Sequence, residues 1–365
     1  MLLLDDKDGA LTGLYTVDVL SEGYLPDNVK TIVKTFSFKQ YQRFRPFKEK
    51  GRIGDEESLI SISKHDAQIT KYLLEYLYES DSDQIKKVVG VMGGHSEARS
   101  SRQYQDIANL CRFLTLEGFL IVTGGGPGMM EAAHLGAYFC YMPDDQWKSL
   151  LDKFTAIRGQ PFDKIPKGEL VDKAGNLRPE GKARYKEFHE WYKFADDARR
   201  TWDGSVGESL AISTWEYGQE PVMPFASKYA CYFQNSIRES ALVREARAGI
   251  VYARGGGGTL REIWQDVEEN FYCENRESLT PMIFFDYESI WGDISSQGTK
   301  PLDIYGTILR ALNYRLGAKG FSWEDKITST TNYEKIHDLL EKHSGKVQKE
   351  FVASFVSPNK ALLDA

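Results

Sequence analysis

The stretch KKVVGVMGG, Lys86 to Gly94, is a short apolar run that ends in two glycines. A run with helical spacing follows it, YQDIANLCRFLTLEG (104–118), and FLIVTGGG (119–126) is again an apolar run ending in glycines. This order predicts a strand, a helix and a second strand. Parallel strands joined by right-handed helical crossovers bring their carboxyl ends to one edge of the sheet. We therefore expect both glycine turns at that edge.

The same alternation continues along the chain. Apolar spacing predicts helices over 128–139, 225–246 and 259–272, and strands over 248–253 and 281–286. The fold class is therefore α/β, with a doubly wound, mainly parallel, Rossmann-like sheet.

Three further parts accompany this sheet. We expect residues 1–84 to form an amino-terminal extension that packs on the core. The nucleotide-binding domain is expected over 85–310, with a charged, aromatic-rich helical insertion at about 143–205. The last segment, 311–365, is expected to be helical because its two long runs have helical spacing.

Composition limits the function classes. The chain has 365 residues, 41% of them hydrophobic, and a net charge of −7, which gives no general attraction to nucleic acid. We expect no nucleic-acid polymer and no membrane as partner, since no run approaches the roughly 20 apolar residues that span a bilayer. The four cysteines lie far apart, without a CxxC pair or a Cys/His cluster at metal-ligand spacing. Free thiols and a cytoplasmic location are expected.

Two glycine turns share one design, in which a strand leads into glycines and then into a helix: VTGGGPGMMEAA (122–133) and YARGGGGTLREI (252–263). Unpaired N–H groups at a helix amino terminus attract anions, and glycines let a phosphate approach the backbone. Glycines also serve tight turns beside strands, but two such turns at one edge favour a ligand. The predicted nucleotide-binding residues are Gly93, Gly94, Ser96, Gly124, Gly125, Gly126, Gly128, Met129, Glu131, Arg254, Gly255, Gly256, Gly257, Gly258 and Thr259.

The spacing of these turns argues against two familiar nucleotide-binding classes. Neither turn contains GxxxxGK[ST], the phosphate-binding loop of many NTPases. Neither fits GxGxxG, because Met129 and Leu260 stand where the last glycine belongs. A dinucleotide dehydrogenase therefore ranks low.

Glu262 and Arg238 each have two interpretations. Thr259 and Glu262 have the T-x-x-E spacing of a capping box, in which both side chains only cap a helix. The same spacing places a carboxylate one helical turn from the predicted phosphate site. Two anions this close together are unfavourable unless a cation lies nearby or the carboxylate takes part in a reaction. Arg238 can supply that cation, although most helix arginines are simply solvated.

Other residues near the turns have ordinary explanations. His95 and His134 fit hydrogen-bonded loop or helix positions better than catalytic ones, and Glu131 suits the positive end of its helix dipole. Three aromatic residues could stack on a base: Trp215, Tyr217 and Phe225. Aromatic side chains at this density more often belong to the core.

The segments GGGPGMMEAA and GGGGTLRE, preceded by a helix with SIRES, resemble the LOG-type proteins. These are Rossmann-like nucleotide phosphoribohydrolases, long mislabelled as lysine decarboxylases, and the longer bacterial members are the most similar. The resemblance covers roughly Lys86 to Asp286. The family's second signature, PGGxGTxxE, has Arg254 here in place of its proline and is matched by Gly255, Gly256, Gly258, Thr259 and Glu262.

The resemblance implies hydrolysis of the N-glycosidic bond of a nucleoside 5′-monophosphate to a free base and ribose 5-phosphate, without metal or organic cofactor. The glycine turn and Thr259 would hold the phosphate. Glu262 would stabilise oxocarbenium-like charge or activate water, and Arg238, at the place of the family's catalytic arginine, would orient the phosphate or Glu262. A homodimer or higher homo-oligomer is also implied.

Two other function classes stay open. The protein could be a non-catalytic nucleotide sensor, because an arginine at position 254 could grip phosphate and favour binding over turnover, whereas Arg238 and Glu262 together favour an enzyme. A glycosyl or phosphoribosyl transferase would show itself by requiring an acceptor. Adenine is the expected base, with cytokinin-type, guanine and pyrimidine bases as alternatives.

Overall fold

The computed structural model describes residues 12–49, 56–79, 84–157, 182–217, 222–274, 276, 278–286, 288, 290–292, 303–320 and 325–351. Within these ranges, one sheet has the strand order β6-β5-β4-β3-β7-β8-β9, and every neighbouring pair is parallel. Its strands are β3 Lys87–Met92, β4 Phe119–Thr123, β5 Ser209–Thr214, β6 Lys228–Tyr232, β7 Gly249–Tyr252, β8 Met282–Phe284 and β9 Ile327–Ser329.

The order of the strands reverses between β3 and β7. From β3 the chain builds outward to β6, returns to place β7 against the other side of β3, and builds outward again to β9. In open parallel sheets, ligands bind at the carboxyl ends of the strands beside such a reversal.

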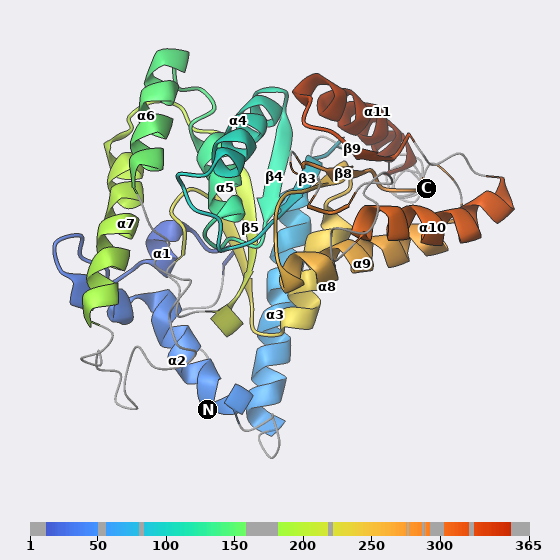
Figure 1. Ribbon diagram of the computed structural model, residues 1–365. Helices are drawn as coiled ribbons and strands as arrows, with labels where there is room; N and C mark the ends of the chain where they lie inside the picture. The colour runs from blue at the N-terminus through green and yellow to red at the C-terminus, as the bar shows by residue number, and fades with distance from the viewer. Residues whose placement is uncertain are drawn as a thin grey trace, which may run out of the picture.

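Helices cover both faces of this sheet (Figure 1). One face packs against α3 Glu56–Leu77, α8 Asn235–Glu245, α9 Gly257–Tyr272 and α10 Ile304–Leu316. The other face packs against α4 Arg102–Leu116, α5 Met129–Tyr138, α6 Asp144–Ala156, α7 Lys182–Thr201 and α11 Tyr333–Phe351. Side chains of β3 alternate accordingly: Val88 and Met92 join the first cluster, Val89 and Val91 the second. The prediction of a doubly wound α/β sheet is confirmed.

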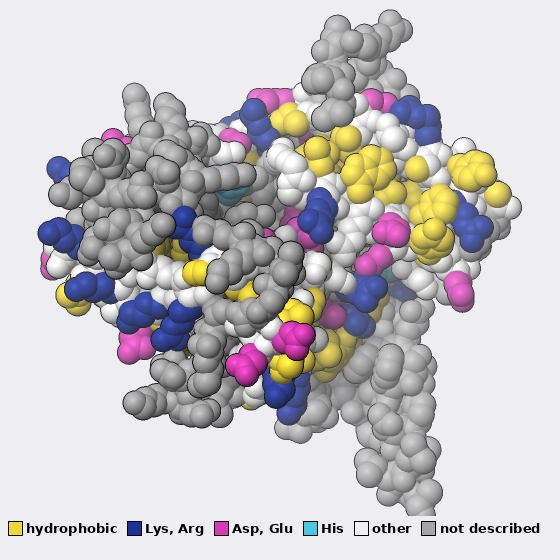
Figure 2. Space-filling model, turned by 90° about the horizontal axis from the view of Figure 1, so that it is seen from below, with side chains coloured by type: hydrophobic (Ala, Val, Ile, Leu, Met, Phe, Trp, Pro, Cys, Tyr) yellow, Lys and Arg dark blue, Asp and Glu magenta, His cyan; other side chains and the backbone are white. Residues whose placement is uncertain are grey.

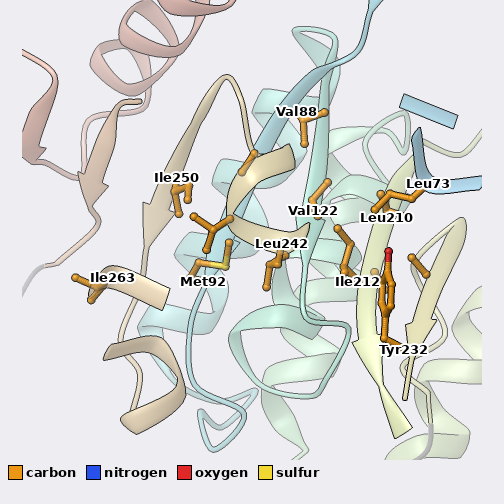
Figure 3. Close-up of a cluster of buried hydrophobic side chains, with 14 of the residues drawn as sticks. Leu73, Val88, Met92, Val122, Leu210, Ile212, Tyr232, Leu242, Ile250 and Ile263 are labelled. Carbon is orange, nitrogen blue, oxygen red and sulfur yellow. The ribbon is translucent and has the colours of Figure 1, made fainter. Parts of the chain in front are cut away.

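The core on the first face anchors the elements that lead to the glycine turns. Figure 3 shows Met92, Leu242 and Ile263 packed in this core. Met92 comes directly before Gly93, Leu242 lies one helical turn after Arg238, and Ile263 follows Glu262. The backbone at these three positions is therefore fixed by packing.

Amino-terminal residues lie against the end of the sheet formed by β5 and β6. They form α1 Val17–Leu20, the 3-10 turn η2 Val29–Lys34, α2 Phe36–Glu49, α3 and a small antiparallel pair, β1 Tyr78–Glu79 and β2 Gln84–Ile85. α3 packs on β6, and α2 packs on the 3-10 turn η4 Trp215–Tyr217. Tyr15 also makes an antiparallel bridge with Tyr229 of β6, so it covers part of this edge strand.

Three sequence expectations need correction. The helix predicted over 225–246 begins only at Asn235, because Lys228–Tyr232 forms β6. β5 was not predicted at all. Both strands are buried nearly throughout, so they lack the alternation that marks a strand, and short apolar runs fit helix and strand equally. The segment 311–365 is not wholly helical, since β9 supplies a strand too short to show a period.

The predicted insertion at 143–205 contains α6 and α7, and residues 158–181 between them lie outside the described ranges. The predicted end of the nucleotide-binding domain, at residue 310, falls in the middle of α10. That helix continues past it and is followed by the 3-10 turn η5 Gly317–Lys319. Among the described helices, none is long and apolar enough to cross a membrane.

Candidate functional site

A cavity of about 300 Å³ lies at the carboxyl edge of the sheet, where the strand order reverses. Loops after β3, β4, β5 and β7 line it, together with residues of α2, α8 and α9. The predicted site residues that line this cavity are Gly93, Gly94, Ser96, Gly124, Gly125, Gly126, Arg238, Gly256, Gly257, Gly258, Thr259 and Glu262. Parallel topology thus brings the three glycine turns together.

The second glycine turn continues directly into α9. Gly256 is the N-cap residue, α9 begins at Gly257, and no side chain caps the helix. Thr259 is therefore inside the first turn, and the capping-box interpretation of Thr259 and Glu262 is wrong. The amides of Gly257, Gly258 and Thr259 precede the first intrahelical hydrogen bond, which Leu260 N–H donates to Gly256. They leave an uncapped, positive helix end at the cavity, which is suited to a phosphate.

Arg238 is not a solvated helix arginine. It is 8% exposed, its Nε donates to the carbonyl oxygen of Ile212 at 3.1 Å, and its Nη1 lies 3.6 Å from Oε1 of Glu262. The guanidinium occupies the space beside Gly124: a Cβ there would lie 2.5 Å from Nη2. A side chain at position 124 would therefore have to displace the buried cation.

Glu262 carries an unusual charge environment. Burial raises the pKa of its carboxyl to about 7, the Arg238 guanidinium acts in the opposite direction, and the Glu239 carboxylate raises it further. Glu239, which no sequence pattern indicated, also lines the cavity. Its carboxylate accepts from Asn235 Nδ2 at 2.9 Å and lies 2.8 Å from Arg261 Nη2. At neutral pH Glu262 can therefore exchange a proton while Glu239 is held by a cation.

Hydrogen bonds join the three turns to one another. Gly94 N–H donates to Arg254 at 2.8 Å, and Met129 N–H donates to Gly94 at 3.1 Å. Gly128 has φ 70°, and a Cβ there would lie 2.4 Å from the Gly94 carbonyl oxygen, so only glycine fits. Five predicted residues do not line the cavity and instead support it or lie beside it: Gly128, Met129, Glu131, Arg254 and Gly255.

Glu131 is the clearest of these corrections. It is fully buried and makes a bidentate ion pair with buried Arg99, whose Nε donates to Oε2 at 3.0 Å. The guanidinium carbon of Arg99 lies 3.7 Å from the ring centre of Trp191, and Nη1 donates to that residue's carbonyl oxygen at 2.9 Å. Glu131 therefore fastens α5 to the loop after β3 and to α7, rather than binding a ligand.

Glu131→Gln is expected to lower the free energy of unfolding by about 3 kcal/mol, because it leaves a buried guanidinium without its counter-charge. Chemical denaturation measures this change. The control is Glu208→Gln, which removes the exposed partner of Lys86 at 3.1 Å and should cost less than about 1 kcal/mol. Equal losses in the two variants would contradict the structural role of Glu131.

Arg254 lies beside the cavity and not in it. Its side chain is half-exposed, with Nε 3.9 Å from Glu97 and Nη1 3.7 Å from Glu288. Both distances are those of loose surface ion pairs. The idea that Arg254 grips a bound phosphate finds no support in this arrangement.

The two histidines differ. His95 lines the cavity. His134 is buried, with Nε2 2.8 Å from Thr123 Oγ1 and Nδ1 2.9 Å from Ser209 Oγ, and burial lowers its pKa to about 3. Thr123 Oγ1 also accepts the N–H of Gly125 at 2.9 Å, so neutral His134 helps to hold the first turn in place.

Of the aromatic residues proposed to stack on a base, Trp215 lines the cavity. Phe225 belongs to the core instead, and the side chain of Tyr217 lies outside the described part of the chain. Besides Glu239, lining residues that sequence analysis did not name are Ser37, Met130, Ser213, Thr214, Val222, Tyr229 and Cys231. Several of these residues lie on β5 and β6. A prediction of these two strands would have placed them at the same edge of the sheet as the glycine turns.

A larger groove, of about 610 Å³, lies at the opposite edge of the sheet. It is lined by the amino-terminal ends of β3 and β4 and by α11, and it contains none of the glycine turns. Within the described ranges, no three His, Cys, Asp or Glu side chains are grouped so that they could hold a metal ion.

Comparison with known proteins shows that one segment of the chain is similar to a known family. Residues 86–139 match the model of the SLOG cluster4 family. This SLOG-like segment runs from β3 through α4 and β4 to α5, and so contains the first two glycine turns. No curated protein matches the chain. A solved structure, the molybdenum cofactor binding protein from the phototrophic bacterium Rippkaea orientalis, is 14% identical, with a TM-score of 0.36, and the match covers 70% of this chain and 96% of that one.

Proposed function

We propose that the protein hydrolyses the N-glycosidic bond of a nucleoside 5′-monophosphate, with AMP as the expected substrate, to a free base and ribose 5-phosphate. The observation that supports this most directly is the meeting of three features in one cavity: the uncapped start of α9, the buried cation of Arg238 and the carboxyl of Glu262. An anion site alone would support only binding.

The proposed roles follow from charge. The phosphate binds at Gly257, Gly258 and Thr259, where backbone amides and the helix dipole favour an anion. Glu262, ionised, faces the ribose and accepts a proton from water while the water oxygen bonds to C1′. The bond from C1′ to the base nitrogen breaks at the same time. The base takes up a proton from solvent as it leaves, and Glu262 then returns its proton to solvent. The carboxylate also stabilises the positive charge that develops on the ribose.

Arg238 acts as a positioning residue in this scheme. Its guanidinium is fixed by the Ile212 carbonyl and lies near Glu262, so it favours the ionised form of that carboxyl and orients it. A phosphate contact from Arg254 would favour a non-catalytic sensor, but this side chain lies outside the cavity. The hydrolase is therefore the better-supported proposal.

The test is release of base and ribose 5-phosphate from AMP, GMP, CMP and UMP, followed by chromatography. Base release without any acceptor supports a hydrolase. Release only in the presence of a sugar or phosphate acceptor would point to a transferase, and binding without release would point to a sensor.

Activity is expected to rise with pH through about 7, because the proposed mechanism needs ionised Glu262 and the pKa of this carboxyl is raised to about 7. The dependence of kcat/KM on pH reports groups of the free enzyme. Initial rates from pH 5 to 8 should increase and then level off. A rate that falls over this interval would mean that Glu262 acts in its protonated form.

We also expect self-association. Figure 2, a view from below, shows hydrophobic side chains gathered at the right, the side on which Figure 1 places α9 and α10. Exposed aromatic side chains on these helices are Trp264, Tyr272 and Tyr314. Light scattering should give a mass of at least twice 41.5 kDa. A monomer mass at tens of micromolar protein would overturn this.

With four free cysteines, all buried, we further propose a cytoplasmic location.

A further inference from the structure

The amino-terminal helix α2 forms one end of the cavity. Ser37, in its first turn, lines the cavity together with Trp215 and Val222. The opposite end is the start of α9, which follows β7. In the sheet, β5 lies three strand spacings from β7 and β6 lies four. These separations are about 14 and 19 Å. With a phosphate at α9, the far end of a nucleotide would reach toward α2 and η4.

Polar groups at this far end lack partners. The Ser37 side chain is 6% exposed, and its hydroxyl makes no hydrogen bond within the described part of the chain. Trp215 is 2% exposed, and its Nε1 has no acceptor among the described residues. Gln40, one turn after Ser37 on α2, has an unpaired, buried Oε1. Burying such groups without hydrogen bonds is costly, and most buried polar groups are paired.

Other buried hydroxyl groups in the same amino-terminal segment do have hydrogen-bond partners. Thr31 Oγ1 donates to the carbonyl oxygen of Asn28 at 2.7 Å, and Thr35 Oγ1 donates to that of Ile32 at 3.0 Å. Both are buried and both are paired. Ser37 and Trp215, by contrast, line the cavity where α2 meets η4, and their polar groups are unpaired among the described residues.

We propose that this end of the cavity takes the polar edge of the nucleobase, and that Ser37 determines base specificity. This rests on the proposed function. The Ser37 hydroxyl both donates and accepts, whereas an indole N–H only donates and an amide oxygen only accepts. A nucleobase edge offers donors and acceptors side by side. Base recognition thus depends on the amino-terminal region and not on the glycine turns.

Ser37→Ala is the direct test, made in the full chain and in a common Glu262→Gln background so that bound nucleotide is not consumed. Calorimetry measures the affinity for AMP, GMP, CMP, UMP and ribose 5-phosphate. The affinity for the best-bound nucleotide should fall about tenfold, since the base loses a hydrogen bond in a buried site. The affinity for ribose 5-phosphate should not change, because this ligand has no base.

Stability separates this role from a structural one. Ser37→Ala removes an unpaired hydroxyl, so the Tm of the free protein should stay the same or rise. The control Ser344→Ala removes an equally buried hydroxyl on α11, which donates to Leu340 at 2.8 Å outside the cavity. That variant should lose stability and keep its affinity.

A second comparison uses the indole N–H. Trp215→Phe should weaken nucleotide binding, whereas Trp291→Phe should not, although Trp291 also has a buried, unpaired Nε1 outside the cavity. In ¹⁵N-labelled protein, the indole resonance lost in Trp215→Phe should shift with nucleotide but not with ribose 5-phosphate.

Unchanged nucleotide affinity in Ser37→Ala, or an equal loss for ribose 5-phosphate, would overturn the inference while leaving the proposed function standing. If the protein with native Ser37 binds neither ribose 5-phosphate nor any nucleotide, the proposed function fails, and the inference fails with it.

Discussion

Glu262→Gln is expected to lower the rate of base release by about 10²–10⁴-fold, the usual contribution of a general acid–base group. Glutamine has nearly the same shape, but it can neither accept the proton of the attacking water nor stabilise positive charge on the ribose. Because Glu262 does not cap α9, its loss should not unfold the start of that helix. Circular dichroism and a thermal melt establish that the fold is kept, and chromatography of the released base gives the rate.

The matched control is Glu269→Gln on the same helix. Glu269 also joins α9 to α8, with Arg244 Nε 3.2 Å from its Oε1, but it lies outside the cavity. This control should keep the wild-type rate. Substantial base release by a folded Glu262→Gln variant would remove Glu262 from the mechanism. The glycine loop would then remain only an anion-binding site.

Gly257→Asp is expected to weaken binding of any phosphate ligand by at least about 100-fold, because like charges placed together cost several kcal/mol. The variant should fold normally. A Cβ at position 257 meets nothing within 4 Å, and a carboxylate in the first turn of α9 interacts favourably with the helix dipole. The new carboxylate would compete for the same amides as the phosphate.

Gly257→Asn is the control, since asparagine has the same shape without the charge. Its affinity for AMP and for ribose 5-phosphate should fall much less. Calorimetry with both ligands gives the comparison. If a folded Gly257→Asp variant bound AMP as tightly as wild type, the phosphate would have to lie elsewhere.

Much of the fold could be predicted because its signals are local. Strands β3, β4, β7 and β8 are apolar runs, and three of them lead into glycine turns or helices with clear spacing. β5, β6 and β9 could not be predicted in this way. The first two are stabilised as strands by burial between distant elements, including α3 and Tyr15, and β9 has only three residues.

The candidate site was predictable to a similar extent. Parallel topology requires the loops after β3, β4 and β7 to meet, and residues of all three line the cavity. Ser37 and Glu239 reach it through tertiary packing of α2 and α8, which no local pattern encodes. Glu131 was misassigned because its partner, Arg99, comes from a different loop and the two meet only in the folded protein.

Asp66 of α3 has a consequence for how this protein can be divided. Its buried carboxylate accepts the N–H groups of Phe233 and Gln234, at 3.0 and 2.9 Å, just before α8 begins. A fragment that starts at the first strand of the main sheet would lose this anchor and leave the buried amide of Phe233 and the partly buried amide of Gln234 without acceptors. It would also lose one wall of the cavity. We therefore expect the amino-terminal region to be needed for an intact cavity, and loss of ligand binding in such a fragment would reflect damage to that cavity.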